Sequence, residues 1–447
     1  MTRLDAERWA EATEGWCARP GPAGAICTDT RKLGEGDWFL ALRGERFDGH
    51  DFLEQASEAG IAGAIAEEAP VGWERGLVVV DDTLEALQAA SSWRRERFRG
   101  PVVGITGSAG KTTTRAMIER VLAPLGRVHG TAGNLNNHIG LPLSVLASPD
   151  DADVWVLEMG MSGPGEIELL QRLARPTVRL ITNVSAAHLQ STGTLEGVAA
   201  CKQEMFDGAR AGDLVLVNVD DPLVAAMPVP GAATVLRYGS ETGCDVELLH
   251  AEVDGGALCT RVHVRTPRGE VRATVPAPGH HLALDALAAV AVGHVLGVSC
   301  AEMAAGLEAY VPVGMRMRIE RYAGITVIND AYNANPASLA AALRTLMQAD
   351  GTRRIALLGD MLELGEAEAD AHREAVVLAS ELGVDLLGLA GPRMGTAAAH
   401  ATVPVVVGED SSVLGQLVAP GLRSGDVVLV KGSRGARMER VLQGLGD

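Results

Sequence analysis

Val102-Val-Gly-Ile-Thr106, followed at once by Gly107-Ser-Ala-Gly-Lys111-Thr112-Thr113, is the stretch of this chain that decides its fold. The first part is short, apolar and β-branched, which predicts a buried strand, and the second is a glycine-rich loop that opens a helix. Glycines let backbone N–H groups turn inward around a polyphosphate, and the helix N-terminus adds partial positive charge. Lys111 can reach the outer phosphates, and the Thr112 hydroxyl can bind Mg²⁺. The stretch therefore predicts a nucleotide phosphate site.

This loop departs from the general pattern GxxxxGK[ST], because the position five residues before Gly110 is Ile105 and not glycine. The shorter form TGxxGKT is complete. The alternative is a glycine-rich turn that binds no nucleotide, but the strand, the GKT sequence and the helix together favour a phosphate loop. Its candidate residues are Gly107, Ser108, Ala109, Gly110, Lys111, Thr112 and Thr113.

Working outward from the loop, buried strands alternate with helical patterns. VWVLEMG (154–160), VRLITNV (178–184) and DLVLVNVD (213–220) read as strands, and GEIELLQRLA (165–174) reads as a helix. Such alternation predicts a doubly wound parallel sheet, whose ligands bind at the carboxyl ends of the strands. Residues 235–276 read as shorter antiparallel strands, and Leu282–Gly297 as a nearly all-apolar helix.

The chain of 447 residues is long enough for about three domains. The basic run that ends in Gly100-Pro101 and the start of a further α/β pattern near 313 suggest the boundaries. We therefore expect an α/β protein with a small N-terminal α/β domain (1–98), a central doubly wound phosphate-loop domain (99–312) and a C-terminal Rossmann-like α/β domain (313–447).

Composition narrows the class of protein. A formal net charge of −18 disfavours a nucleic-acid or anionic-membrane partner, which calls for a basic surface. The N-terminus has no apolar signal segment, and no apolar run reaches the roughly 20 residues that span a bilayer. The six cysteines form no CxxC pair, so we expect reduced thiols. These features predict a cytoplasmic protein without membrane insertion.

Lysine is scarce in this chain. Of 39 basic residues only four are lysine, namely Lys32, Lys111, Lys202 and Lys431. A genomic preference for arginine codons explains the low overall share of lysine. Arginine, however, cannot replace lysine as a compact charge or a nucleophilic amine. The lysines that remain are therefore candidates for function, apart from Lys32, which lies in a polar turn.

Three residues form a candidate metal and lysine cluster. Glu158 ends the VWVLE strand, His188 follows the VRLITNV strand, and Lys202 lies in the helical stretch GVAACKQEMFDGA. A solvent-facing acid, a structural histidine and an exposed helical lysine are the simpler alternatives. A buried lysine near a metal can instead react with CO₂ to give a carbamate, which is a metal ligand, and neutral imidazole also binds metals.

The chain resembles the Mur ligase family. The resemblance rests on TGSAGKTTT, GNLNNHIGLPL, LEMGMSGPGEI, CKQEMF, NDAYNANPASL, LGDMLELG and VKGSR, and it runs from DTRKL and FDGHDF to the C-terminal end. Folylpolyglutamate synthases share the phosphate loop, whereas GNLNN, YNANPAS and LGDMLELG favour the branch that adds D-alanyl-D-alanine.

The resemblance implies a ligase that uses ATP and Mg²⁺, with a second Mg²⁺ held by a carbamylated Lys202. Its substrates would be UDP-MurNAc-tripeptide and D-Ala-D-Ala, joined through an acyl phosphate by a monomer. Lys111, Glu158, His188 and Lys202 would be catalytic, and Thr112 would join the last three at the metal. Arg316 and Asp330 would contact the phosphate and ribose of ATP. The substrate residues would be Thr30, Arg31, Asp48, Gly49, His50, Asn134, Asn136, Asn137, Tyr332, Asn333, Asn335 and Lys431.

One stretch departs from the family. Where the pattern G-x-H-N-x-x-N is usual, residues 279–285 read GHHLALD, and we expect His281 and Asp285 at the adenine in place of asparagine. Alternatives to the ligase remain: a sibling that adds a single amino acid, a phosphate-loop NTPase or switch, and a non-catalytic relative. The last would be expected to have lost Lys111, Glu158 or Lys202, and all three are present.

Overall fold

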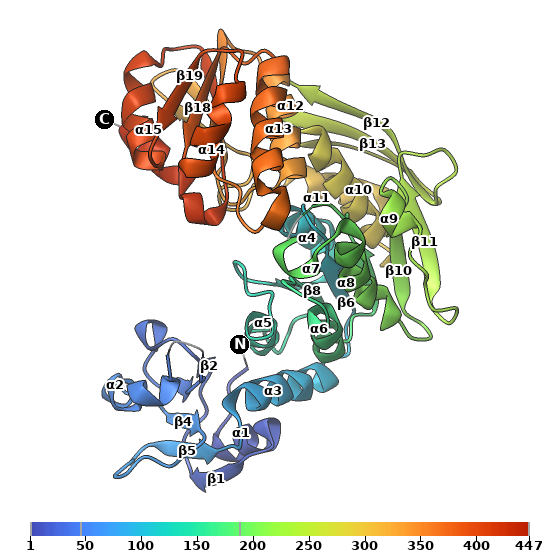
Figure 1. The fold of residues 1–447 in the computed structure, drawn as a ribbon. Coiled ribbons are helices and arrows are strands. Elements are labelled where there is room, and N and C mark those ends of the chain that lie inside the picture. The colour runs from blue at the N-terminus through green and yellow to red at the C-terminus, as the bar shows by residue number, and fades with distance from the viewer. Residues whose placement is uncertain (1, 45–46, 187–188, 446–447) are drawn as a thin grey trace. The chain divides into compact units, whose positions relative to one another are not determined.

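The computed structural model describes residues 2–44, 47–186 and 189–445. The chain forms two compact units: Met1–Ile105, Leu125–Met161 and Gly165–Arg179 make the first, and Thr106–Pro124, Ser162–Pro164 and Leu180–Asp447 make the second. Its strands form three sheets, each with parallel strands and accompanying helices (Figure 1). The expected α/β class is therefore confirmed, while the domain boundaries near 98 and 313 stay a prediction.

The N-terminal sheet has five strands in the order β1-β5-β4-β3-β2. These are β1 (Trp16–Arg19), β2 (Ile26–Cys27), β3 (Trp38–Leu40), β4 (Gly63–Ala66) and β5 (Gly76–Val79), and β1 alone among them is antiparallel to its neighbour. The helices are α1 (Ala6–Thr13), α2 (Leu53–Glu58) and α3 (Thr83–Arg97). Trp38 is fully buried, and a Cβ at Gly63 or Gly76 would lie 2.6 or 2.8 Å from its ring, so glycines make room for this indole.

The central sheet has nine strands in the order β14-β13-β12-β11-β10-β9-β6-β8-β7. They are β6 (Val102–Thr106), β7 (Val128–Gly130), β8 (Val154–Glu158), β9 (Val178–Ile181), β10 (Leu214–Asn218), β11 (Thr234–Gly239), β12 (Val246–Asp254), β13 (Cys259–Thr266) and β14 (Gly269–Val275). The expectation that residues 235–276 are all antiparallel is wrong for β11, which pairs parallel with both β10 and β12. The connection from β10 is long enough for a crossover, which includes α9 (Pro222–Ala225).

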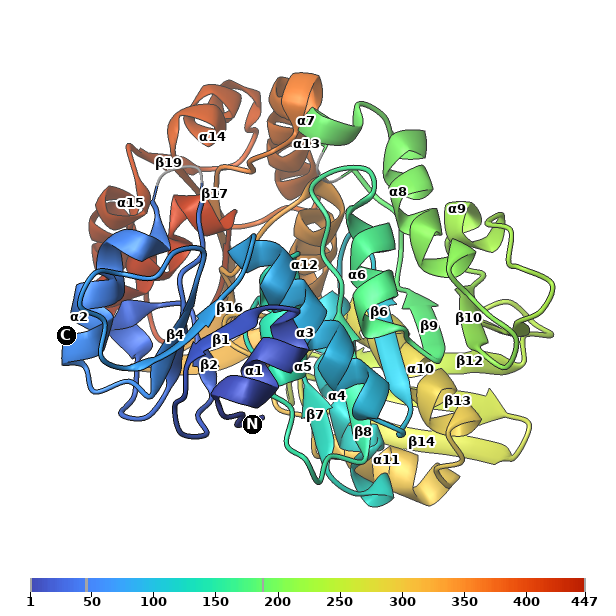
Figure 2. The same ribbon diagram turned by 90° about the horizontal axis from the view of Figure 1, so that it is seen from below.

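Helices of the central region are α4 (Lys111–Val121), α5 (Gly140–Leu146), α6 (Glu166–Ala174), α7 (Leu189–Thr192), α8 (Leu195–Asp207), α10 (His280–Val295) and α11 (Cys300–Glu308). The apolar helix α10 packs against α4, β12 and β13 (Figure 2). A helix that is apolar around its circumference is expected to be enclosed in this way.

The C-terminal sheet has six strands in the order β15-β16-β20-β17-β18-β19, all parallel except β15. Its strands are β15 (Arg318–Tyr322), β16 (Ile325–Asp330), β17 (Arg353–Gly359), β18 (Leu386–Ala390), β19 (Val405–Gly408) and β20 (Asp426–Lys431). The helices are α12 (Pro336–Gln348), α13 (Glu368–Glu381), α14 (Pro392–Ala397) and α15 (Ser411–Val418). Strands β16 and β20 end in Asp330 and Lys431, so this edge carries predicted site residues.

Two further expectations can be compared with the fold. Within the described residues, no helix is long and apolar enough to cross a membrane. None of the six cysteines, all of which lie within the described ranges, forms a disulfide.

Candidate active site

The phosphate loop joins β6 to α4 through two glycines with positive φ angles. At Gly107, where φ is +150°, a Cβ would lie 1.8 Å from Thr182 Oγ1. Gly110 takes φ +81° and precedes the helix, and no side chain caps the first turn of α4. The N–H groups of the first turn and the helix dipole give this turn the character of an anion site.

Residues that follow β9 hold the loop from the side. Ser108 and Ala109 donate their N–H groups to the backbone and side-chain oxygens of Asn183, both at 3.0 Å. In return, Asn183 Nδ2 and Thr182 Oγ1 donate to the Ala109 carbonyl at 3.1 and 2.6 Å. Sequence reasoning missed this support, although Thr182 and Asn183 lie at the carboxyl end of the predicted strand 178–184.

The side chain of Lys111 folds back over the phosphate loop to its first residue, Gly107. Its ammonium group donates to the Gly107 carbonyl at 2.7 Å. Thr112 and Thr113 are buried in the first turn of α4, and the side chain of Tyr310 hydrogen-bonds Thr113. The lysine, the hydroxyl groups and the helix N-terminus therefore lie together in the loop and the first turn of α4, and their role in binding phosphate stays a prediction.

Asp285 lies under this loop, and the structure gives it surroundings that the sequence did not suggest. Its carboxyl group accepts from Thr114 Oγ1 at 2.8 Å, and a Cβ on Gly110 would lie 2.5 Å from Asp285 Oδ1. Burial raises the pKa of Asp285 to about 7, although the Thr114 hydroxyl opposes the shift. Asp285 thus supports the loop from α10.

Residues 279–285 differ from the family pattern at other positions than expected, because His281 is not a substitute for an asparagine. Counted from Gly279, the histidine of the pattern falls at His281 and its second asparagine at Asp285, while the first asparagine falls at Leu282. Leu282 is buried and apolar, so no polar group replaces that amide. Burial lowers the pKa of His281 to about 4, which keeps this imidazole neutral at physiological pH.

Lys202 is not an exposed helical lysine. Its side chain is almost fully buried in α8. Burial, together with the nearby positive charge of Lys111, lowers the pKa of Lys202 to about 7. An amine with a pKa of about 7 is about half neutral at pH 7 and increasingly neutral above it, and the neutral form is the one that reacts with electrophiles such as CO₂.

Of the other predicted metal ligands, the structure describes Glu158 but not His188. Glu158 ends β8 in the first unit, is 1% exposed, and has its N–H bonded to Thr131 Oγ1 at 2.9 Å. His188 lies outside the described residues. Among those described, no three His, Cys, Asp or Glu side chains form a metal-binding group. The donors foreseen from the sequence include a hydroxyl and a lysine carbamate, and such oxygen donors suit Mg²⁺.

At the C-terminal sheet, a buried ion pair joins the ends of two neighbouring strands. Lys431 is 2% exposed, and its Nζ donates to Asp330 Oδ2 at 2.5 Å and to the Asn333 carbonyl at 3.0 Å. The Arg316 guanidinium stacks 3.6 Å from the centre of the Tyr332 ring. Asn335 caps α12 by accepting the Ser338 N–H at 2.8 Å. Lys431 therefore fixes the loop that carries these predicted ATP and dipeptide residues.

Ser433 and His372, which sequence reasoning missed, hold the loop that follows β17. Leu362 donates its N–H to Ser433 Oγ at 2.9 Å, and Ser433 donates its own N–H to the Asp360 carbonyl at 3.0 Å. His372 accepts the Met361 N–H at Nε2, 2.9 Å away. Asp360, Met361 and Leu362 lie in the motif LGDMLELG and Ser433 lies in VKGSR, whereas no motif contains His372.

Two groups of predicted substrate residues belong to the first unit. Thr30 and Arg31 follow β2, where Arg31 is 84% exposed and pairs with Asp29 at 2.8 Å. Asp48 caps the short 3-10 turn η2 (Gly49–Phe52), which begins with Gly49 and His50. A Cβ on Gly49 would lie 2.7 Å from the backbone of Ala41 and Leu42, so only glycine fits there.

The predicted asparagines form a loop before α5. Asn134 is exposed, and Asn136 accepts the Gly160 N–H at its carbonyl, 2.8 Å away. Asn137 Oδ1 accepts the Gly140 N–H at 2.8 Å, which is the turn-forming use of asparagine that was the alternative to substrate binding.

Comparisons with known proteins agree with the resemblance. Three domain families match the chain: "Mur ligase family, catalytic domain" over residues 24–92, "Mur ligase middle domain" over 105–293, and "Mur ligase, glutamate ligase domain" over 315–434. The UDP-N-acetylmuramoyl-tripeptide–D-alanyl-D-alanine ligase of Bacillus subtilis is 36% identical, with 100% of this chain and 99% of the relative covered.

Solved structures are similar along the whole chain as well. MurF from Acinetobacter baumannii superposes with a TM-score of 0.90 at 30% identity, covering 99% of this chain and 98% of that one. The MurF ligase of Thermotoga maritima, solved in complex with ADP, gives a TM-score of 0.83 at 29% identity, covering 94% and 97%.

Proposed function

We propose that this chain, which belongs to the Mur ligase family, joins D-alanyl-D-alanine to UDP-N-acetylmuramoyl-tripeptide with cleavage of ATP to ADP and phosphate. The product is UDP-MurNAc-pentapeptide, a peptidoglycan precursor, made in the cytoplasm. The observation that carries the proposal is the phosphate loop beside the buried amine of Lys202. The choice of substrates rests on end-to-end similarity to ligases named for this reaction.

The first step is phosphoryl transfer to the peptide. A carboxylate oxygen of the tripeptide attacks the γ-phosphorus, the bond to the β–γ bridging oxygen breaks, and ADP leaves. Lys111 exchanges its bond to the Gly107 carbonyl for a phosphate oxygen, and the first turn of α4 donates N–H groups to the phosphates. These fixed donors stabilise the negative charge that spreads over the transferred group.

The second step forms the amide. The free amine of D-alanyl-D-alanine attacks the acyl carbon, loses a proton, and expels phosphate with the oxygen that the carboxylate contributed. The residues around Asp330, Tyr332 and Asn333 are proposed to hold ATP and the dipeptide, in a loop that Lys431 keeps in place. An acyl phosphate hydrolyses in water, so these residues also exclude solvent.

Mg²⁺, held by Thr112, Glu158, His188 and a carbamylated Lys202, would neutralise charge on the phosphates. The carbamate forms when the neutral Lys202 amine attacks CO₂ and releases a proton. The low pKa of this amine provides the neutral form near pH 7. Arginine has no such form, because it stays charged.

Replacement of Lys202 tests the carbamate. Lys202→Arg keeps a long basic side chain but cannot form a carbamate, and we expect ligase activity to fall by roughly a hundredfold, as for loss of one transition-state contact. Intact-mass measurement should find the mass of one CO₂ on the wild type and none on the variant. Lys32→Arg, at an exposed position, is the matched control and should keep both activity and the added mass. Full activity of Lys202→Arg would refute the carbamate.

The function itself is tested by phosphate release from ATP and Mg²⁺ with UDP-MurNAc-tripeptide, with and without D-alanyl-D-alanine. Release that depends on the dipeptide, with UDP-MurNAc-pentapeptide in the products, supports the proposal. Activity only with a single amino acid would identify a sibling ligase. Phosphate release that ignores both substrates would leave an NTPase.

A further inference from the structure

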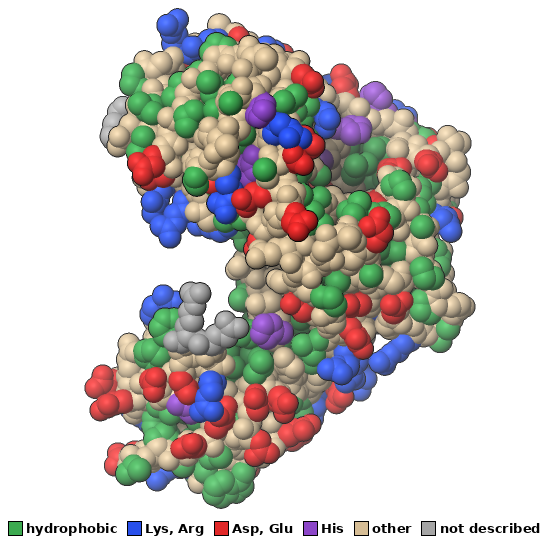
Figure 3. All heavy atoms as spheres, in the orientation of Figure 1, with side chains coloured by type: hydrophobic (Ala, Val, Ile, Leu, Met, Phe, Trp, Pro, Cys, Tyr) green, Lys and Arg blue, Asp and Glu red, His purple; other side chains and the backbone are tan. Residues whose placement is uncertain are grey.

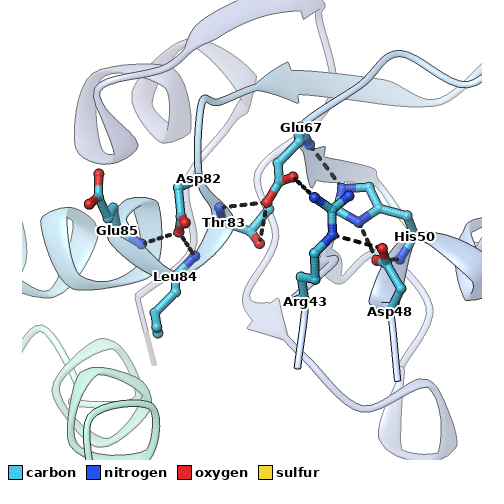
Figure 4. Close-up of polar contacts among 8 residues, drawn as sticks. All are labelled: Arg43, Asp48, His50, Glu67, Asp82, Thr83, Leu84 and Glu85. Atoms are coloured by element: carbon cyan, nitrogen blue, oxygen red, sulfur yellow. Dashed lines mark hydrogen bonds and ion pairs between the residues drawn. The ribbon is translucent and has the colours of Figure 1, made fainter. Parts of the chain in front are cut away.

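A network of charged side chains occupies one edge of the N-terminal sheet (Figure 4). Arg43 follows β3, Glu67 follows β4, and Thr83 follows β5, so all three lie beyond the carboxyl ends of parallel strands. Arg31 follows β2 at the same edge. Ligands of open α/β sheets bind at this edge.

His50 is fixed inside the network by both of its ring nitrogens. The Glu67 N–H donates to His50 Nε2 at 3.0 Å, and a backbone N–H can only donate. The ring proton must therefore sit on Nδ1, which lies 2.6 Å from Asp48 Oδ1 and donates to it. His50 is thus a neutral imidazole in one tautomer, with no ring nitrogen left for a substrate.

Arg43 is held by two carboxylates. Its Nε lies 2.8 Å from Asp48 Oδ2, and its Nη1 lies 2.8 Å from Glu67 Oε2. Hydrogen bonds from the backbone and ring of His50 hold the pKa of Asp48 well below its usual range, so this carboxylate stays ionised. Glu67 Oε1 also receives the N–H and hydroxyl of Thr83, both at 3.4 Å, at the start of α3.

The charges argue against direct binding of an anion by this network. One guanidinium faces two carboxylates, and His50 is neutral, so the network has a net negative charge. Acidic side chains are also numerous on the face of the N-terminal part that Figure 3 shows. A nucleotide diphosphate would be repelled by Asp48 and Glu67, and the side chain of His50 has no free nitrogen to offer.

We propose that Glu67 is a positioning residue for the nucleotide-sugar substrate. Its backbone N–H fixes His50 and its carboxylate fixes Arg43, and together they hold the Asp48–His50 turn at the ligand edge. The charged side chains of Arg43, Asp48 and Glu67 stay turned toward one another, so their role is to hold the turn in place. This inference rests on the proposed function, in which the turn belongs to the UDP-sugar site.

Glu67→Gln removes the ion pair with Arg43 and keeps the size and the backbone N–H. We expect the KM for UDP-MurNAc-tripeptide to rise roughly fivefold, since one charge-assisted hydrogen bond is weakened. The kcat and the KM values for ATP and D-alanyl-D-alanine should stay within about twofold, because those groups bind elsewhere. The matched control is Glu68→Gln, the same charge change at the exposed neighbour, which should alter none of these constants.

A second pair of variants separates positioning from stability. His50→Asn keeps a donor for Asp48 but cannot reach the Glu67 N–H. This variant should raise the KM for UDP-MurNAc-tripeptide. The melting temperature of the rest of the protein should stay unchanged. Nitrogen NMR of His50 in the wild type should find a neutral ring protonated at Nδ1. A protonated ring or the opposite tautomer would overturn the proposal, as would Glu67→Gln changing all three KM values equally.

The outcomes distinguish this inference from the proposed function. If the wild type shows no dipeptide-dependent phosphate release, binding of UDP-MurNAc-tripeptide is measured directly by calorimetry. Weaker binding to Glu67→Gln than to the wild type and Glu68→Gln would support the positioning role even then. Equal binding to all three, or no binding to the wild type, would overturn it.

Discussion

The phosphate loop and the Asp48–His50 turn both lie at the carboxyl ends of parallel strands, yet different forces hold them. The phosphate loop is fixed by hydrogen bonds of its own backbone to neighbouring residues, such as those of Ser108 and Ala109 to the backbone and side chain of Asn183. The Asp48–His50 turn is fixed by ion pairs of partly exposed side chains. A closely packed backbone tolerates no added atom, whereas exposed ion pairs contribute little each and weaken with salt.

The difference suggests a division of tasks. ATP needs an unchanging set of donors around its phosphates during the reaction, which a packed backbone provides. The nucleotide sugar is bound at a distance from the chemistry, so its turn only needs to be held well enough for binding. Changes at the phosphate loop should therefore alter catalysis strongly, and changes at the turn should alter one KM mildly.

The largest effect should come from Gly107→Ala. The new methyl group would lie 1.8 Å from Thr182 Oγ1, at a φ angle of +150° that favours glycine. We expect kcat/KM for ATP to fall by a hundredfold or more, on the order expected for misplaced catalytic donors. Steady-state kinetics with varied ATP measure it.

Gly212→Ala is the control for this substitution. Its φ is +90°, and nothing lies within 4 Å of a Cβ placed there. It should lower stability slightly and leave the kinetics unchanged. Similar kinetics for both alanine variants would mean that packing against Thr182 does not position the loop.

An intermediate effect is expected at Asp285, a buried carboxyl group next to the phosphate loop. Its pKa of about 7 means that the folded protein keeps a proton that the unfolded chain releases above about pH 4. The free energy of unfolding should thus fall as pH rises from about 4 to about 7, and stay reduced above that. Asp285→Asn keeps the acceptor for Thr114 and does not titrate.

We therefore expect Asp285→Asn to be more stable than the wild type by about 2 kcal/mol at pH 8, with a smaller difference at pH 5. Denaturant unfolding at both pH values measures this difference. An advantage of the same size at both pH values would show that Asp285 does not titrate in this range.

The smallest effect should come from Arg43→Lys. A lysine keeps the charge but reaches only one of the two carboxylates, and the KM for UDP-MurNAc-tripeptide should rise about threefold. Added salt should reduce the difference in this KM between variant and wild type, because salt screens the ion pairs at residue 43 in both proteins. A gap that grows with salt would indicate that the network is not held by ion pairs.

Much of the fold was predictable because the buried strands are continuous apolar runs. Residues 102–106 form β6 as predicted, and the run from 154 to 160 contains β8, which ends at Glu158. The direction of β11 was not predictable, since a short strand reads alike whether its neighbour is parallel or antiparallel. Its pairing depends on the crossover that precedes it.

The site was predictable where one local motif contains it. The phosphate loop is such a motif, and the scarcity of lysine singled out Lys202, which proved to be buried. Asn183 and Ser433 were missed because their partners are distant in sequence. Asp285 was expected at the adenine, whereas its described hydrogen bond is with Thr114 of α4. The sequence could not show this contact, because it depends on the packing of α10 against α4.

The few lysines also make the protein chemically addressable. Lys111 is partly covered and Lys202 and Lys431 are buried, while Lys32 is exposed beside Thr30 and Arg31. An amine-reactive label should therefore attach to side chains mainly at Lys32. The rate of that labelling would report occupancy of the N-terminal sheet edge in a footprinting measurement that needs no turnover.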